Sequence, residues 1–130
     1  NIVAQRGAIA GLKIKDEWFP EVFNLQRENQ KNVFNVISRI DGFEIPVYPS
    51  NGNFLIIEIN DDEVKPEAIC SIFAKNKILV RQGSYHTKKF GDKFIKVSLS
   101  VPKKWTDEFI SLFPSVVKNA RGINFTNNLY

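Results

Sequence analysis

The segment 93–101 constrains the fold most, because its apolar and polar residues alternate along its length. One side receives Ile95, Val97, Leu99 and Val101, and the other receives Phe94, Lys96, Ser98 and Ser100. A period of two is typical of a β-strand that turns one face to a core and the other away from it. A sheet that is buried on one face needs a second layer, and the pattern of the remaining chain supplies helices for it.

Three further segments have strand chemistry, namely 43–47, 53–59 and 77–81. The segment 53–59 is apolar on both sides, as expected for a central strand. Helices are predicted over 2–12, from 16 to about 41, over 63–75, and from Pro102 onward. Short turns between neighbouring strands favour an antiparallel or mixed sheet. The predicted fold class is therefore α+β, a small sheet with helices packed on one side, preceded by a long helix of the interdomain type.

The long helix from residue 16 is the least easily covered element. Its apolar positions recur every three or four residues, and its opposite face, including Arg27 and Glu28, is predicted to be exposed to solvent. Because so small a sheet would not cover the whole stripe, residues 1–40 are predicted to bridge to a domain outside this sequence. Residues 41–123 then form a small domain, and 124–130 form a polar tail. The absence of a starting methionine before Asn1 also predicts that the sequence is a piece of a longer chain.

Composition excludes several classes of protein. The chain has 130 residues, of which 43% are hydrophobic and 25% charged, as in an ordinary single domain. No apolar run approaches the length of a membrane span, so no membrane contact is expected. The lone Cys70 excludes an internal disulfide and fits a reducing, cytoplasmic location. The net charge of +4 comes from scattered lysines, which argues against nucleic acid as a partner. His86 is the only histidine, so neither a metal site nor a catalytic triad is expected.

Four stretches, in this order, resemble the C-terminal part of class I/II (fold type I) aminotransferases. Residues 5–12 (Gln-Arg-Gly-Ala-Ile-Ala-Gly-Leu) resemble the small-residue helix that follows the cofactor lysine. Residues 48–54 (Tyr-Pro-Ser-Asn-Gly-Asn-Phe) resemble the turn into the first long strand of the small domain. Residues 77–81 (Lys-Ile-Leu-Val-Arg) resemble the strand that ends in Val-Arg, and residues 94–98 (Phe-Ile-Lys-Val-Ser) the strand that carries an arginine at its third position. The turn and the Val-Arg strand lean toward the histidinol-phosphate aminotransferase-like branch.

The resemblance implies a division of labour between two domains. The large domain of the same subunit, absent here, would hold pyridoxal 5'-phosphate on a lysine, and the parent enzyme would be a homodimer. The small domain would close over an amino-acid or keto-acid substrate. The resemblance therefore implies no catalytic, cofactor-binding or metal-binding residue in this chain, no cofactor bound to it alone, and no activity of the isolated piece.

Three substrate-contacting residues are implied, each with an alternative. Lys96 stands where the family has an arginine that grips the substrate's α-carboxylate, so it is a weaker carboxylate contact, or the substrate is anchored elsewhere, or Lys96 is simply solvated. Arg81 either reaches a distal phosphate or carboxylate of the substrate or pairs with a nearby acid on the surface. Asn53 either contacts the substrate or caps the turn after Gly52.

Two other function classes remain open on the sequence. The run 88–97 superficially resembles the RNP1 strand of an RNA-recognition module, with Phe90 and Phe94 as the stacking aromatics. Against it, Asp92 places a negative charge in the strip, and the order of elements is not βαββαβ. A free-standing interaction domain would instead bury the long helix in another chain. The substrate, the choice between transamination and decarboxylation, and the oligomeric state of the piece do not follow from the sequence.

Overall fold

The computed structural model describes residues 1–123, and the predicted tail 124–130 lies outside the described residues. Two helices open the chain, α1 (Ile2–Lys13) and α2 (Lys15–Ile37), and only Ile14 separates them. The strands are β1 (Phe43–Glu44), β2 (Phe54–Ile59), β3 (Arg81–Gln82) and β4 (Phe94–Ser98). The remaining helices are α3 (Pro66–Lys75) and α4 (Lys103–Ala120), with 3₁₀ turns at 83–85 and 91–93.

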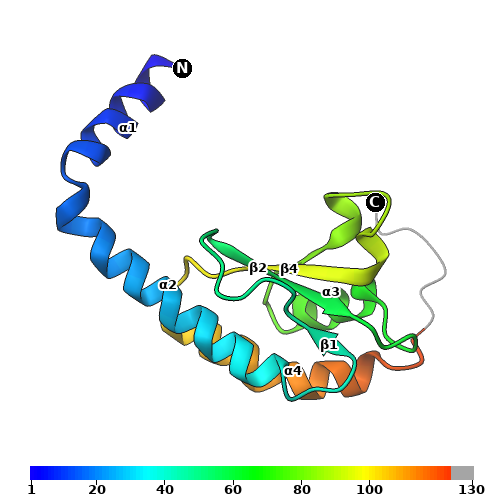
Figure 1. Ribbon diagram of the computed structural model, residues 1–130. Coiled ribbons are helices and arrows are strands. Elements are labelled where there is room, and N and C mark those ends of the chain that lie inside the picture. The colour runs from blue at the N-terminus through cyan, green and yellow to red at the C-terminus, as the bar shows by residue number, and fades with distance from the viewer. Residues whose placement is uncertain (124–130) are drawn as a thin grey trace.

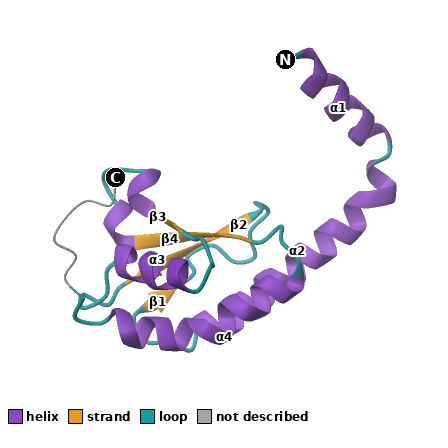
Figure 2. Cartoon of the chain, turned by 180° about the vertical axis from the view of Figure 1, so that it is seen from behind, coloured by secondary structure: helices purple, strands orange, loops and turns teal. Residues whose placement is uncertain are grey.

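The four strands form one antiparallel sheet in the order β1-β2-β4-β3. Helices α3 and α4 lie on one face of it, and the second half of α2 packs beside α4 (Figures 1 and 2). The predicted α+β class, with helices on one side of a small sheet, is confirmed, and β2 is a central strand as expected. Within residues 1–123 no α-helix lies on the other face of the sheet, where the 3₁₀ turn at 83–85 approaches the ring of Phe94.

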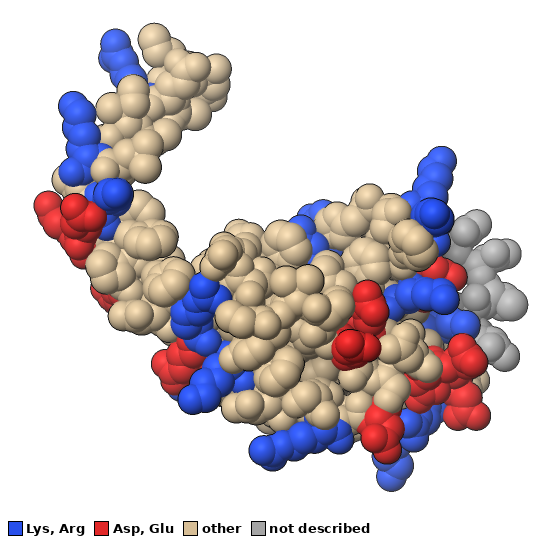
Figure 3. All heavy atoms as spheres, viewed as in Figure 1, with Lys and Arg blue, Asp and Glu red and all other residues tan. Residues whose placement is uncertain are grey.

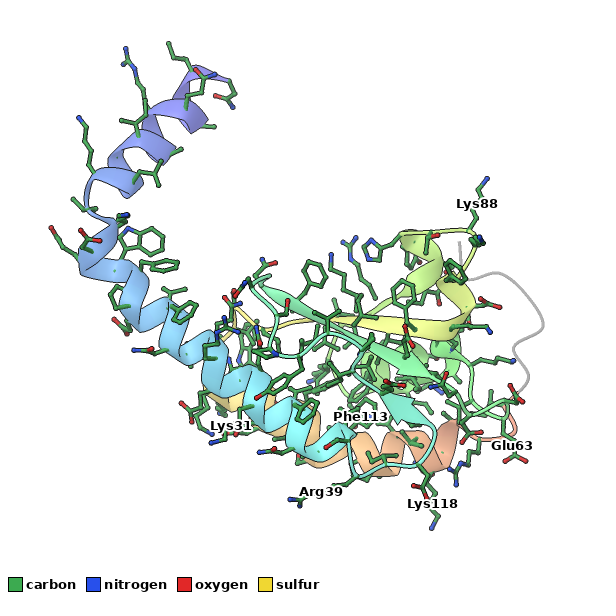
Figure 4. All side chains as sticks on the ribbon, in the orientation of Figure 1. Lys31, Arg39, Glu63, Lys88, Phe113 and Lys118 are labelled. Atoms are coloured by element: carbon green, nitrogen blue, oxygen red, sulfur yellow. The ribbon has the colours of Figure 1, made fainter. Side chains whose placement is uncertain are left out.

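The core lies between the sheet and α3 and α4. Alternation places Leu55, Ile57, Ile95 and Val97 on the covered face, all buried. Aromatic rings from both helices fill the layer beneath them. The Phe73 and Phe109 rings stack with centroids 4.9 Å apart, and the ring of Phe113, labelled in Figure 4, meets that of Phe43 edge-on at 5.5 Å.

The first part of the chain stands away from this core. We call residues 1–24 the arm and residues 25–123 the body. Every residue of the arm is exposed except Gly11, which is half-buried. In Figure 1 the arm rises from the body as α1 and the start of α2. Its exposed apolar side chains are Ile2, Val3, Ile9, Leu12, Ile14, Trp18, Phe19, Val22 and Phe23.

Two predicted strands proved too long, each for a physical reason. The segment 43–47 pairs only over Phe43–Glu44, because Pro46 has no N–H to donate and the chain bends there. The segment 77–81 pairs only at Arg81, because its first residues cap α3 instead. The Ile78 N–H donates to Phe73 O at 3.0 Å and the Lys77 N–H to Ala74 O at 2.9 Å. These two bonds, with Lys77 at φ 63°, make a Schellman cap.

The other boundaries differ by a few residues. The strand predicted over 93–101 ends at Ser98, and the helix predicted from residue 63 begins at Pro66. The long helix ends at Ile37 rather than near residue 41. Gly42 follows it in a turn, where its φ of +83° suits a glycine and where a Cβ would lie 2.8 Å from the Asp61 side chain.

Candidate functional site

The uncovered face of the sheet carries the two charged residues singled out from the sequence. We call it the open face. Its residues are half-buried or exposed: Phe54, Ile56 and Glu58 from β2, Phe94, Lys96 and Ser98 from β4, and Arg81 from β3. A mixed apolar and cationic surface of this kind differs from both a core and a fully solvated face.

Arg81 and Lys96 are direct cross-strand partners in the sheet. Ile56 pairs with Lys96 from the other side, so the three residues make one row across β3, β4 and β2. Side chains of direct partners stand on the same face, with Cβ atoms about 4.5–5.5 Å apart, and two like charges so placed repel each other. Within residues 1–123, no carboxylate lies within 4.0 Å of either cation, although Glu58 shares the face. This pair of adjacent cations suits an anion.

An aromatic ring holds the Lys96 ammonium in place. The Nζ atom lies 4.1 Å from the centroid of the Phe54 ring, a cation–π contact. The same ring approaches Gly52, where a Cβ would stand only 3.5 Å from it. Phe54 is thus packed between the Lys96 side chain and the turn that precedes β2.

Polar side chains of α2 fix that turn. The Gln30 amide makes a two-way contact with Ser50, donating to its carbonyl at 2.7 Å and accepting from its N–H at 3.0 Å. Arg27 donates to Ser50 O at 2.9 Å and to Asn51 Oδ1 at 2.6 Å, and Gln26 donates to Gly52 O. Arg27 was predicted to be exposed to solvent, but it is half-buried against the turn because of these hydrogen bonds. A stable turn in this position keeps the Phe54 ring against Lys96.

A second amide of α2 holds the far end of β4. Asn29 is fully buried and donates to Leu99 O at 3.0 Å and to Val101 O at 2.9 Å. Sequence reasoning missed both Asn29 and Gln30, although their spacing contained a signal. They occupy the helical positions that continue the stripe of Val33 and Ile37, so an amide there is expected to be buried and bonded.

Asn53 does not join the row of Arg81 and Lys96. Its side chain is exposed, and its backbone carbonyl accepts the Leu99 N–H at 2.9 Å, which extends the pairing of β2 with the chain after β4. The structure thus gives Asn53 a backbone role at the start of β2. A contact between its side chain and a substrate stays a prediction.

Other reactive groups of the described residues are not assembled into a site. Burial raises the pKa of the Cys70 thiol from its ordinary 9.0 to about 12, and the nearby charge of Glu67 adds to the rise. The thiol is therefore protonated at neutral pH. His86 lies exposed in the segment 83–93 between β3 and β4. Over residues 1–123, no group of three His, Cys, Asp or Glu side chains is placed to hold a metal ion.

The arrangement of aromatics differs from the RNA-recognition pattern. Phe90 lies in the loop before β4 rather than in the strand, and Phe94 is half-buried with its ring against Gly83. Basic and acidic side chains are scattered over the surface visible in Figure 3, and the basic ones form no single stripe. None of the helices in the described part of the chain is both long and apolar enough to cross a bilayer.

Comparison with known proteins identifies a protein with a similar fold but assigns the chain to no family. No family model matches the chain, and no curated protein sequence matches it. Among solved structures, the chain is similar to MppP, a pyridoxal-phosphate-dependent enzyme of fold type I, in a structure soaked with the product 2-ketoarginine. The TM-score is 0.70 at 10% sequence identity over 82% of this chain. The match covers 30% of the MppP chain, so this chain spans less than a third of that protein. The chain therefore has a fold that occurs as part of a fold type I enzyme.

Proposed function

We propose that this chain is the C-terminal, substrate-closing domain of a pyridoxal-phosphate-dependent aminotransferase. The parent enzyme would transfer an amino group between an amino acid and a keto acid. The observation that carries the proposal is the cross-strand pair of Arg81 and Lys96 on the open face, with no carboxylate to neutralise it in residues 1–123. The fold shared with part of MppP supports it.

The chemistry of the pair fits a substrate acid. A carboxylate between Arg81 and Lys96 would relieve the repulsion of two neighbouring cations and accept charge-assisted hydrogen bonds from both. Arginine offers a planar fork for two parallel bonds, and lysine offers a point charge. Phe54 compensates in part for the missing fork, because it restricts where the Lys96 ammonium can lie.

The arm fits a contact with the large domain of the same subunit. Trp18, Phe19 and Phe23 form a chain of ring contacts with centroids 5.6 to 5.8 Å apart, yet all three side chains are exposed. An apolar surface of this kind is usually covered in an assembled protein. In the proposed parent, a homodimer in the cytoplasm, the arm would connect the closing domain to the cofactor domain.

The described residues do not themselves fit pyridoxal 5'-phosphate. Such a site needs a lysine for the aldehyde, donors for the phosphate and an acid for the pyridine nitrogen. Arg81 and Lys96 lie on an open sheet surface, and a cavity of about 360 Å³ between the chain before β3, β4 and α4 is lined mainly by apolar side chains. The cofactor belongs to the large domain of the proposed parent, and no chemical step is assigned to this chain.

The proposal is tested by substitutions at the pair in the parent enzyme. Lys96→Arg restores the fork, so it is expected to raise kcat/KM for α-carboxylate substrates by at least about tenfold, the value of one charge-assisted hydrogen bond. Arg81→Ala is expected to lower kcat/KM by an amount equivalent to about 2–5 kcal/mol. Steady-state kinetics of the purified variants measures both effects.

A nearby cation serves as the control. Lys93 precedes β4 and is exposed, so Lys93→Ala is expected to leave kcat/KM unchanged. If Lys96→Arg and Lys96→Ala are both silent, Lys96 is not the carboxylate anchor. A loss of thermal stability without any change in kcat/KM for Arg81→Ala would remove Arg81 from the substrate site.

The exposed arm also favours a second candidate function, a protein-interaction module. On that reading the apolar side chains of α1 and α2 would cover another chain rather than a domain of the same subunit. The length of the natural chain separates the two. If the natural protein has a large domain before residue 1, the enzyme function is supported. If the natural protein begins near residue 1, the protein-interaction function is supported.

A further inference from the structure

A hollow of about 380 Å³ runs along the open face of β2. Phe54, Ile56 and Glu58 line it, and these are the three residues of the strand that alternation turns to this face. On its other side the hollow is bounded by residues of the segment 46–50, between β1 and β2. We call it the β2 hollow. It lies on the same face of the sheet as the pair of cations.

Two residues of the β2 hollow contact or pair with Lys96. Ile56 is the direct cross-strand partner of Lys96, so their side chains stand next to each other on the open face. The ring of Phe54 lies 4.1 Å from the Lys96 Nζ atom. The lysine ammonium therefore lies at the border of the hollow, toward the start of β2.

The other end of the β2 hollow carries negative charge. Glu58 is half-buried, lines the hollow, and lies two residues beyond Ile56 on β2. Its cross-strand partner is Glu44 of β1, so a second pair of like charges stands on the open face. Within residues 1–123, no lysine or arginine nitrogen lies within 4.0 Å of either carboxylate. This end of the hollow suits a cation.

The sheet keeps the two kinds of charge apart. Lys96 and Glu58 are diagonal neighbours on β4 and β2, at a spacing of about 7–8 Å. The Lys96 ammonium lies over Phe54 instead, on the side of Ile56 away from Glu58, and forms no ion pair with that carboxylate. Both cross-strand pairs of charged residues are thus like-charged, one at each edge of the open face. Such a surface fits a molecule whose charges are arranged in the complementary order.

We propose that the β2 hollow binds the aliphatic stem of an acid that carries a positive charge at its far end. The acid group lies at Arg81 and Lys96, and the positive group lies at Glu58 and Glu44. This inference rests on the proposed function and names its substrate class, amino acids with an amino or guanidino group at the end of the side chain. Charge-assisted hydrogen bonds form at both ends, and the stem covers Ile56.

The test compares three kinds of probe in NMR titrations of the whole chain, followed by backbone amide shifts. Hexanoate carries the acid and the stem, hexylamine carries the stem and the cation, and 6-aminohexanoate carries all three. We expect 6-aminohexanoate to bind at least about tenfold more tightly than hexanoate, the value of one charge-assisted hydrogen bond. Hexanoate should shift Arg81 and Lys96, and 6-aminohexanoate should shift Glu58 and Glu44 as well.

Chain length provides a further check on the same spacing. We expect the terminal amino group to add little affinity in 4-aminobutanoate relative to butanoate, because this chain is too short to reach from Lys96 to Glu58. The gain should appear in 6-aminohexanoate and persist in 8-aminooctanoate. A gain that is the same at every length would mean that the amino group does not reach Glu58, and it would overturn the inference.

Matched variants separate the two ends of the site. Glu58→Gln keeps the shape of the side chain and removes its charge, so it should abolish the advantage of 6-aminohexanoate and leave hexanoate binding unchanged. Lys96→Ala should weaken both acids and spare hexylamine. Glu63, an exposed glutamate before α3, provides the control (Figure 4). Glu63→Gln makes the same change in net charge and should alter none of these affinities.

Each failure has its own signature. If hexanoate shifts Arg81 and Lys96 but 6-aminohexanoate binds no better, the inference fails and the proposed carboxylate anchor still stands. If no acid shifts the two cations, the carboxylate anchor fails and the inference fails with it. Equal losses from Glu58→Gln and Glu63→Gln would show that only the net charge of the chain matters, and this result would also overturn the inference.

Discussion

The two halves of α2 belong to the same helix but have opposite surroundings. From residue 25 onward, the inward side chains of the helix find partners in the body. Asn29 and Gln30 donate hydrogen bonds to its backbone carbonyls, and Val33 and Ile37 are buried in its core. Before residue 25, Trp18 lies exposed on the same helix. The first half has the backbone hydrogen bonds of a helix, but it lacks the tertiary packing that usually stabilises a helix in a protein.

This difference shows that the body has a packed core of its own and that the arm has none. The body closes a core between the sheet and three helices, α3, α4 and the second half of α2, and the buried amides of Asn29 and Gln30 donate to backbone carbonyls. The arm offers only its own helix and an apolar surface, as the docking element of a larger protein would. Substitutions should therefore affect the stability of the two regions very differently.

The largest effect is expected at the centre of the body. Phe113 is fully buried and touches the rings of Phe43, Phe73 and Phe109. Phe113→Ala should lower the free energy of unfolding by about 3–5 kcal/mol, because it removes apolar contacts and leaves a cavity. Urea denaturation followed by circular dichroism measures the loss. A loss below about 1 kcal/mol would show that the body is not closed around this ring.

The next effect is expected where α2 meets the sheet. Asn29→Ala leaves the carbonyls of Leu99 and Val101 without their donor, so it should cost about 1–3 kcal/mol. Asn24 provides a control on the same helix, because it is the same residue type in an exposed position. Asn24→Ala should stay within about 0.5 kcal/mol of the natural chain. Equal losses at the two positions would contradict the boundary drawn between arm and body.

A smaller effect is expected from alkaline pH. Because burial raises the pKa of Cys70 to about 12, the native chain keeps a proton that the unfolded chain loses near pH 9. Stability should therefore fall as pH rises above about 9, by about 1 kcal/mol at pH 10. The measurement is the difference in this pH dependence between the natural chain and Cys70→Ala, which cancels lysine and tyrosine titration. An identical dependence in both would mean that the thiol is not buried in solution.

The smallest effect is expected in the arm. Trp18→Ala removes an exposed ring and one exposed hydrogen bond to Gly11 O, so it should change the free energy of unfolding of the isolated chain by less than about 0.5 kcal/mol. Analytical ultracentrifugation adds a second readout, since the natural arm should promote self-association and Trp18→Ala should weaken it. A loss of unfolding free energy above about 1 kcal/mol would show that the arm packs on the body.

Sequence periodicity predicted the layers of the fold and the orientation of Lys96, because alternation over 94–98 leaves only one face for that side chain. It did not predict where β3 begins. The segment 77–80 has strand-forming side chains, but its first residues form the C-terminal cap of α3. Whether these residues cap the helix or pair with β4 depends on how the end of the helix lies in three dimensions. Strand register is likewise invisible in one sequence. The pairing of Arg81 with Lys96, which defines the candidate site, therefore appeared only in the structure.

The outer strands of the sheet, β1 and β3, are two residues long each. An edge so short gives an incoming strand few free backbone groups, and Arg81 adds a charge at one of the two edges. Fibrillar growth by strand addition therefore has little to start from on this domain. Concentrated samples should form assemblies through side chains of the arm rather than cross-β aggregates, and such assemblies should disperse when a partner covers the arm.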